Sequence, residues 1–370
     1  MKTMKTSKSL VIFAVAISLL AAACDSDTSP PQTTGGASAA EAAPAFSLAW
    51  SEYPSWSVFG VAELKGIING KAGQLGTVEK THGVDIVLNQ LDYDPCLTAY
   101  ASREVDAVCI TNMDALIPAE EIPSVAILPT STSIGADACI VVGIDSVDQL
   151  KGVDVYGLEK TVSEYCFVRN LQKLGFDPAD FKFTNKDPGA AALAMQIKDS
   201  GTRAIMVWNP FVLQTLKLRP EAKVLFDSSA IPGEIIDMVV VSQAALDRPG
   251  GDKFARAVID AFYQVNDAIA QPDTSSDTLV ALGAKFSNLG LDEMKEVVKQ
   301  TVFYKTPTEA LALFEGSDVQ SVMQTVVGFC VDRQVVSYQP NVAYGADQAA
   351  GQHVRFDPTY IKAIQAQRVR

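Results

Sequence analysis

Short apolar runs alternate along the chain with segments whose apolar residues recur every three or four positions. The first runs are FSLAW, VDIVLNQL, VDAVCI, SVAIL and ACIVVGI, with helical periods over Val58–Ile68 and Pro95–Ser102. Strands that alternate with helices of this length are typical of parallel sheets covered by helices on both faces. The pattern therefore predicts an α/β protein.

A second series of the same kind follows. Its runs are GVDVYGL, FKFTN, RAIMVW and AKVLFD, with helices predicted over Glu164–Leu174 and Ala190–Lys198. One more strand, IDMVVVS, precedes a mainly helical stretch from Gln243 to about Val336. Two successive series of strands and helices, followed by a late strand and helices that return to the first series, predict two lobes. Each lobe should have a parallel-rich sheet flanked by helices, and two crossover hinges should join them. We place these crossovers near Ile140–Gln149 and Gly233–Val241.

These features divide the chain into segments. The predicted segments are a signal peptide (1–23), a tether (24–45), the first part of lobe 1 (46–141), lobe 2 (142–235), the return to lobe 1 (236–340) and a C-terminal extension (341–370).

The N-terminal stretch MKTMKTSKSLVIFAVAISLLAAAC has a basic start, a short apolar run and small residues before Cys24. This order is typical of a lipoprotein export signal, which would leave Cys24 lipidated and the protein anchored on the outer face of the cell membrane. An uncleaved anchor and an ordinary cut after Ala23 are the alternatives. The segment after Cys24 is rich in Pro, Gly, Ser and Thr, which predicts a tether.

The charge and the cysteine content narrow the range of possible functions. The chain carries 30 Lys and Arg against 43 Asp and Glu, a net charge of −13, which argues against nucleic acid and against docking on anionic lipid. Five cysteines remain when Cys24 is set aside. Because five is an odd number, at least one thiol is free or forms a disulfide with another chain, and the sequence does not decide which cysteines pair. The five are Cys96, Cys109, Cys139, Cys166 and Cys330.

Catalytic and metal-binding signals are weak. The chain has two histidines, His82 and His353, and no CxxC, which argues against a zinc site. Both histidines lie outside the loops that follow strands, and there is no P-loop or GxGxxG. We therefore predict a protein that is not an enzyme and needs no cofactor.

Aromatic and acidic residues recur in the loops that follow the predicted strands, where open α/β sheets bind ligands. These loops are WSEYPSW (50–56), TNMD (111–114), STSIGADA (131–138), TVSEY (161–165), WNPF (208–211) and IPGE (231–234). The recurrence indicates a small-molecule site between the lobes.

Several stretches carry a family resemblance: VAELKGII, AYASREVDAVCITNMDAL, DQLKGVDVYGLEKTVSEY and RAIMVWNP. With the lipoprotein signal, they resemble the nitrate-, sulfonate- and taurine-type (NitT/TauT) solute-binding proteins of ABC importers, over nearly all of Phe46–Phe303. The resemblance implies the two-lobed periplasmic-binding-protein fold of type II and a cleft that closes on a small solute. It also implies a monomer that works with a membrane permease and its ATPase.

A narrower resemblance rests on TNMDAL, VWNP, FDSSAIPGEIIDMVVV and RFDPTYI. Together they look like the branch that accompanies urea-carboxylase-type enzymes and is tied to urea or guanidine uptake. This chain departs from the branch at TVSEY, where Glu164 replaces an expected histidine, and at Asp94-Pro95-Cys96, which is more acidic.

Guanidinium needs carboxylates in its plane and aromatic rings on its faces. The expected ligand-binding residues are Trp50, Ser51, Glu52, Trp56, Asn112, Asp114, Ser133, Asp137, Ser163, Glu164, Trp208, Asn209 and Glu234, with Tyr53 and Asp237 as further candidates. Several candidates could instead have a structural role. Trp56 could pack against the following helix, and Asp114, Ser163 and Glu164 could stabilise helix ends. Asp137 and Asn209 could be turn residues, and Glu234 and Asp237 could stabilise the hinge.

The predicted function is capture of a guanidinium-like ion or urea by hinge closure. Urea ranks below guanidinium because a neutral solute would not offset buried carboxylates. Nitrate, a sulfonate such as taurine, or a thiamine precursor remain alternatives within the broader family, and so does a sensory role.

Overall fold

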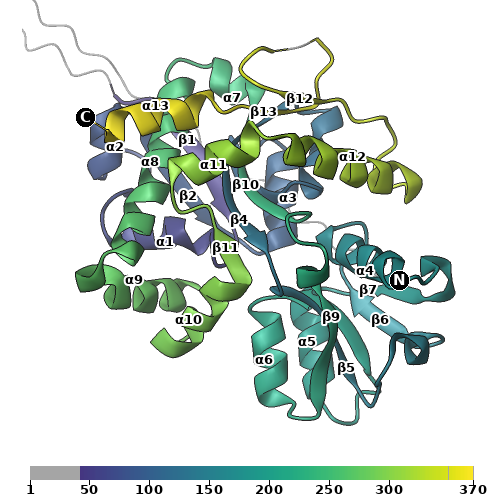
Figure 1. Cartoon of the computed structure of the whole chain (residues 1–370). Helices are drawn as coiled ribbons and strands as arrows, with labels where there is room; N and C mark the ends of the chain where they lie inside the picture. Colours follow the sequence, from purple (N-terminus) through teal and green to yellow (C-terminus); the bar gives the residue numbers. More distant parts are fainter. Residues whose placement is uncertain (1–41, 349, 370) are drawn as a thin grey trace, which may run out of the picture. The chain divides into compact units, whose positions relative to one another are not determined.

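The computed structural model describes residues 42–348 and 350–369. The expected signal peptide, Cys24 and most of the expected tether lie outside the described residues. From Ala42 onward the chain forms one compact unit, which contains two β-sheets flanked by helices (Figure 1). Among the described residues, no helix combines the length and apolar character needed to cross a bilayer.

The larger sheet has eight strands in the order β12-β13-β4-β10-β3-β1-β2, with β11 paired to β4. Its strands are β1 (Ala45–Trp50), β2 (Asp85–Gln90), β3 (Ala107–Thr111), β4 (Ser124–Ser133), β10 (Ile236–Ser242), β11 (Thr301–Phe303), β12 (Val342–Tyr344) and β13 (Val354–Phe356). Every residue of β3 and β4 is buried, as expected for strands covered on both faces. We call this sheet and its helices lobe 1.

The smaller sheet has five strands in the order β7-β6-β8-β5-β9. They are β5 (Asp137–Val142), β6 (Asp154–Gly157), β7 (Lys182–Asn185), β8 (Ala204–Trp208) and β9 (Ala222–Asp227). Strand β5 runs antiparallel to β8 and β9, just as β10 runs antiparallel to β3 and β4 in the larger sheet. The expected α/β architecture is therefore confirmed, although both sheets are mixed.

The helices lie around these sheets (Figure 1). They are α1 (Ser57–Leu64), α2 (Thr77–His82), α3 (Tyr93–Ala101), α4 (Val162–Lys173), α5 (Pro188–Gln196), α6 (Phe211–Leu218), α7 (Gln243–Asp247), α8 (Gly251–Ala270), α9 (Pro272–Lys285), α10 (Leu291–Gln300), α11 (Pro307–Phe314), α12 (Ser317–Asp332) and α13 (Thr359–Arg368). In lobe 1, α8 packs against α1, α9 and α13, while α5 and α6 pack on β8 in lobe 2.

The first crossover differs from the sequence expectation. Strand β5 belongs to the smaller sheet, so the chain changes sheet between β4 and β5, before the expected segment Ile140–Gln149. The boundary expected at residue 141 consequently assigns nearly all of β5 to the wrong lobe. An apolar run shows that a strand is buried but not which sheet it joins, and this limit explains the error.

The C-terminal segment is also different from the expected extension. Strands β12 and β13 join the larger sheet, where Val354–Phe356 pairs with β4 in parallel, and α13 packs on α8. Residues 341–348 and 350–369 therefore belong to lobe 1. Strands of three residues are too short to give a readable alternation, so the sequence pattern missed them.

Candidate functional site

A small space lies where the two lobes meet, and we call it the inner compartment. Its volume is about 10 Å³, room for roughly one water molecule. It is lined by Tyr53, Trp56, Tyr93, Thr111, Asp137, Val162, Trp208, Ile235 and Asp237. These residues come from the ends of strands in both sheets, from the two crossovers and from the start of α4.

Aromatic rings form a continuous wall along this compartment. Tyr53 and Trp56 have ring centroids 4.9 Å apart, and Trp56 stacks on Tyr93 at 5.5 Å with 13° between the ring planes. Tyr93 in turn meets Trp208 of lobe 2 edge-on, at 5.7 Å. The wall therefore runs from one lobe to the other and presents ring faces that could cover a cation.

Three carboxyl groups are buried beside these rings. Asp114 accepts a hydrogen bond from the Tyr93 hydroxyl at 2.6 Å, and Asp137 accepts one from Ser133 at 2.5 Å. Asp237 accepts one from Ser131, also at 2.5 Å. Asp137 opens β5 and Asp237 lies near the start of β10, so two of the three acids stand at the crossovers between the lobes.

Burial dominates the electrostatics of these acids. It raises the pKa of Asp114 to about 6 and that of Asp137 to about 7, although hydrogen bonds from Tyr93 and Ser133 act in the opposite direction. Burial also raises the pKa of Asp237 well above its ordinary value, and the nearby charge of Asp137 adds to the rise. Burial therefore makes the ionised forms of all three carboxyl groups less stable, and a nearby cation would offset that cost.

Several polar atoms around the compartment are buried without a hydrogen-bond partner among the described residues. They include the Trp56 indole nitrogen, the Tyr53 hydroxyl, Oδ1 of Asp114 and the Ser163 hydroxyl. Buried polar groups are rarely left unpaired because each costs about 1–3 kcal/mol. Those beside the inner compartment could therefore bond a polar ligand, although other unpartnered buried atoms lie elsewhere among the described residues.

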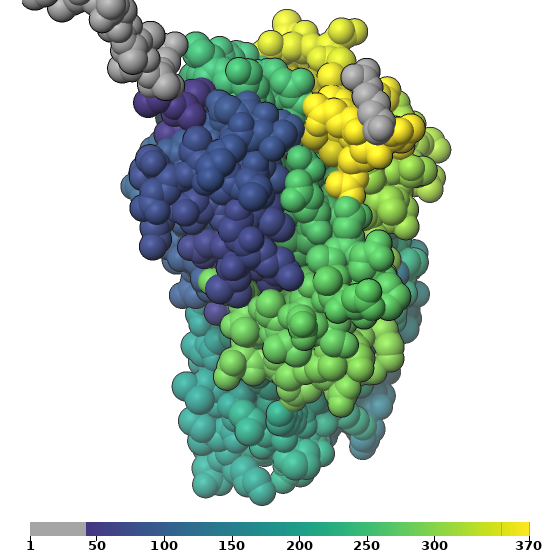
Figure 2. Space-filling model, turned by 90° about the vertical axis from the view of Figure 1, so that its left-hand side faces the viewer, coloured from purple at the N-terminus to yellow at the C-terminus, as the bar shows by residue number. Residues whose placement is uncertain are grey.

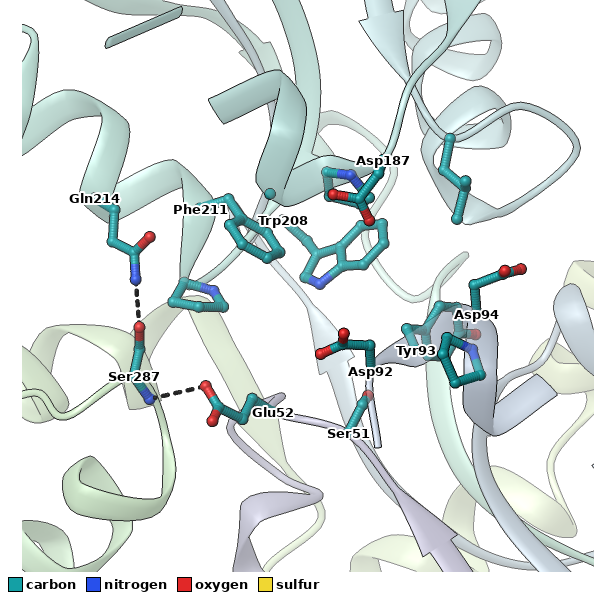
Figure 3. A pocket seen from close by; sticks show the side chains of 15 residues that line it. Ser51, Glu52, Asp92, Tyr93, Asp94, Asp187, Trp208, Phe211, Gln214 and Ser287 are labelled. Atoms are coloured by element: carbon teal, nitrogen blue, oxygen red, sulfur yellow. Dashed lines mark hydrogen bonds between the residues drawn. The ribbon is translucent and has the colours of Figure 1, made fainter. Parts of the chain in front are cut away.

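A larger cavity of about 540 Å³ adjoins the inner compartment, and we call it the outer compartment (Figure 3). Its lining includes Ser51, Glu52, Asp92, Asp94, Asp187, Phe211, Gln214 and Ser287. Tyr93 and Trp208 line both compartments. Of the described residues that line either one, none is Lys, Arg or His, and no group of three or more described His, Cys, Asp or Glu residues is placed to hold a metal ion.

Among comparisons with known proteins, only the comparison with solved structures finds similar proteins. No protein-family model matches the chain, and no curated protein matches it. Among solved structures, the alkanesulfonate-binding protein SsuA from Xanthomonas axonopodis pv. citri, bound to MOPS, is 15% identical with a TM-score of 0.63, covering 81% of this chain and 96% of its own. The periplasmic aliphatic sulphonate binding protein SsuA from Escherichia coli is 16% identical with a TM-score of 0.61, covering 80% and 89%.

A Candida albicans protein described as exhibiting the generic periplasmic binding protein structural fold is 17% identical with a TM-score of 0.57, covering 80% of this chain and 92% of its own. The two sheets, the two crossovers between them and the structural neighbours all indicate the same fold. The chain has the periplasmic-binding-protein fold. In this fold the inner compartment occupies the place where the lobes close.

Side chains of the two lobes contact each other directly in the described structure. Asn209 of lobe 2 donates to Gln300 of lobe 1 at 2.9 Å, and Lys217 pairs with Glu293 at 2.6 Å. On the face shown in Figure 2, the green surface of the α9–α10 region meets the teal surface of lobe 2. The peptide bond between Asn209 and Pro210 is cis.

The periplasmic-binding-protein fold brings together many of the expected site residues. Trp56, Asp137 and Trp208 line the inner compartment, and Ser51 and Glu52 line the outer one. Three more lie against the inner residues or at the lobe contact: Ser133 bonds Asp137, Asp114 bonds Tyr93, and Asn209 bonds Gln300. Ser163 is buried in the first turn of α4, next to the lining residue Val162.

Four expected site residues have other surroundings. Trp50 packs on Gly60 of α1, where an added Cβ would lie 2.8 Å from its ring. Asn112 holds the second crossover through Glu234 O and Ile236 N. Glu164 accepts from the Lys160 backbone amide at 2.8 Å, as a helix-end residue does.

Glu234 also differs from the expectation. It forms a two-pronged ion pair with Arg169, at 2.7 and 2.9 Å, and accepts from the Tyr165 hydroxyl. Burial raises the pKa of Glu234, but these hydrogen bonds outweigh it and hold the pKa below the ordinary value. Its acceptor capacity is already used, so it stabilises the crossover instead of facing solute.

Sequence reasoning missed Tyr93, which contacts both compartments and holds Asp114. Tyr93 begins α3 shortly after β2 ends at Gln90. The rule that ligands gather where strands end would have selected this loop, since DYDP carries an aromatic ring and two acids. Thr111 and Ile235 gave no such signal, because threonine and isoleucine are common strand residues.

Proposed function

We propose that this protein is the extracytoplasmic solute-binding component of an ABC importer and that it captures a small nitrogen-rich cation of the guanidinium type by closure of its lobes. One observation carries the proposal. Asp114, Asp137 and Asp237 are buried together with aromatic rings at the lobe interface, and no basic side chain lines the space between them among the described residues.

The physical argument concerns charge. Carboxylates removed from water are unstable unless a cation or a proton neutralises them. A guanidinium ion offers paired N–H donors to carboxylates and weakly hydrated faces to Trp56 and Tyr93, whose rings stack beside the site. Each cation–π contact contributes about 0.5–2 kcal/mol when water is excluded. A bound cation would therefore make closure more favourable.

Size sets a limit on the solute. The closed inner compartment leaves room for roughly one water molecule, so a guanidinium ion would enter the open form and hold the lobes slightly further apart. The cross-lobe contacts Asn209–Gln300 and Lys217–Glu293 join side chains with rotatable bonds, which could follow such a movement.

Anionic solutes are the competing class, because two structural neighbours are described as sulfonate-binding. The free indole N–H of Trp56 and the Ser163 hydroxyl could donate to an oxyanion. An anion beside Asp114, Asp137 and Asp237 would require all three to be protonated, which at pH 7 costs about 1.4 kcal/mol for Asp114, with its pKa of about 6, and less for Asp137, with its pKa of about 7. Guanidinium is therefore preferred, followed by urea.

The cellular setting follows from the sequence resemblance. We propose that Cys24 carries the lipid anchor, that the protein works as a monomer outside the cell membrane, and that the closed form delivers solute to a permease driven by a separate ATPase. Binding involves no covalent chemistry in this scheme.

The test is calorimetric titration of the protein without its signal peptide, after unfolding and refolding to remove carried-over solute. Guanidinium at micromolar levels, urea, nitrate and taurine are compared on wild type, Asp137→Asn and the control Glu164→Gln, whose carboxylate faces a backbone amide outside both compartments. Saturable guanidinium binding that Asp137→Asn weakens and Glu164→Gln preserves is the expected result. Binding of nitrate or taurine without guanidinium binding would overturn the proposal.

A further inference from the structure

We infer that the solute is an elongated dication: one cationic head occupies the inner compartment, and a second cationic end, joined by a short aliphatic chain, lies in the outer compartment. The inference rests on the proposed function and names a narrower substrate class for the same site. It starts from the mismatch between the two spaces, because a single small ion would leave the cavity of about 540 Å³ empty. Cavities of this size are typical of sites for larger small molecules.

The outer compartment has the composition of a cation site. Four carboxylates line it, Glu52, Asp92, Asp94 and Asp187, and none of them forms an ion pair with a described residue. They come from both lobes, since Asp187 precedes α5 and the other three follow β1 and β2. In Figure 3 Asp92 and Asp187 lie on opposite sides of the Trp208 ring.

Not all four acids are equally available. Asp187 accepts from the Ala190 amide at 2.8 Å and caps α5, and Glu52 receives weak bonds from Gln90 and Ser287. The side chains of Asp92 and Asp94 form no hydrogen bond to described residues. These two are therefore the acceptors best placed to take a second ammonium group.

A buried polar side chain also faces this cavity. Ser51 is only 5% exposed, lines the outer compartment, and its hydroxyl makes no hydrogen bond to a described residue. In Figure 3 Ser51 lies just beneath Asp92. The Ser51 hydroxyl is therefore available to accept from or donate to a polar ligand group in this cavity.

The two compartments are joined by shared rings. Tyr93 and Trp208 line both, and they meet edge-on across the lobe interface at 5.7 Å. An aliphatic chain running along the exposed edges of these rings would keep apolar atoms against apolar surface and place a charge at each end. The Phe211 ring, next to Trp208 at 6.2 Å, extends the apolar wall into the outer cavity.

The experiment compares, by calorimetry, two guanidines that have the same four-carbon chain. Agmatine carries a terminal ammonium group and n-butylguanidine does not, so the ratio of their affinities isolates the second charge. The ratio is measured on wild type, on Asp92→Asn/Asp94→Asn, and on the control Asp199→Asn/Asp277→Asn, which removes the same charge from exposed positions away from the cavity.

Wild type and the control should bind agmatine about fivefold or more tightly than n-butylguanidine, and the Asp92/Asp94 double variant should lose most of that preference. Equal affinities on wild type, or a preference that survives in the double variant, would overturn the dication while leaving guanidinium binding and the proposed function intact. If neither guanidine nor guanidinium itself binds, the proposed function fails and the dication falls with it.

Discussion

Replacing Asp137 with Asn should stabilise the empty protein, although the residue lines the ligand compartment. Burial raises the pKa of this carboxyl from 3.8 to about 7. Each pH unit between the two values corresponds to about 1.4 kcal/mol, so the ionised group costs the empty fold up to about 4 kcal/mol above pH 7. Asn removes the charge and keeps an oxygen that can accept from Ser133.

The sign of the pH dependence follows from the direction of the shift. The folded carboxyl holds its proton more tightly than the unfolded one, so its contribution favours folding at low pH. That contribution is lost as pH rises from about 4 toward about 7, the pKa in the folded protein. The advantage of Asp137→Asn over wild type should therefore be small near pH 4 and reach its maximum of up to about 4 kcal/mol near pH 8.

Thermal unfolding at both pH values measures this difference. Heat is the appropriate denaturant because urea and guanidinium are candidate ligands. The exposed substitution Asp199→Asn serves as the control and should change stability little at either pH. An Asp137→Asn protein that is less stable than wild type near pH 8, or an advantage that shrinks as pH rises, would refute the argument that this acid is destabilised by burial.

Three further outcomes are expected. Trp56→Ala should weaken guanidinium binding about tenfold in calorimetry by removing a ring face of the inner compartment, whereas unchanged affinity would place the solute elsewhere. Arg169→Met should lower the free energy of unfolding by about 2 kcal/mol because it leaves Glu234 without its ion-pair partner, and a neutral result would mean that solvent already screens this pair. Gly60→Ala should lower Tm through a clash with the Trp50 ring, a loss of about 1–3 kcal/mol, and a wild-type melting curve would show that the ring can move aside.

Much of the fold could be predicted from the sequence because long buried strands leave continuous apolar runs. Strands β3, β4, β5 and β10 were all located in this way. The direction and sheet membership of β5 could not be predicted, since antiparallel and parallel strands buried on both faces have the same pattern.

The candidate site was predicted in outline for a related reason. The rule that strand ends gather ligand-binding groups selected Trp56, Asp137 and Trp208 correctly as residues of the lobe interface. It could not show that Glu234 is already neutralised, because its partner Arg169 lies 65 residues away in the sequence. Pairing across such distances is fixed by tertiary packing and leaves no local signal.

The five cysteines of the described residues have a practical consequence. All are buried and none forms a disulfide. Burial raises the pKa of every one of their thiols, which suppresses the thiolate that alkylating reagents attack. In a protein that begins after Cys24, a single cysteine introduced at the rim of the outer compartment could therefore be labelled with a fluorophore without first removing these five. The native fold would then serve directly as an optical sensor whose signal reports lobe closure in real time.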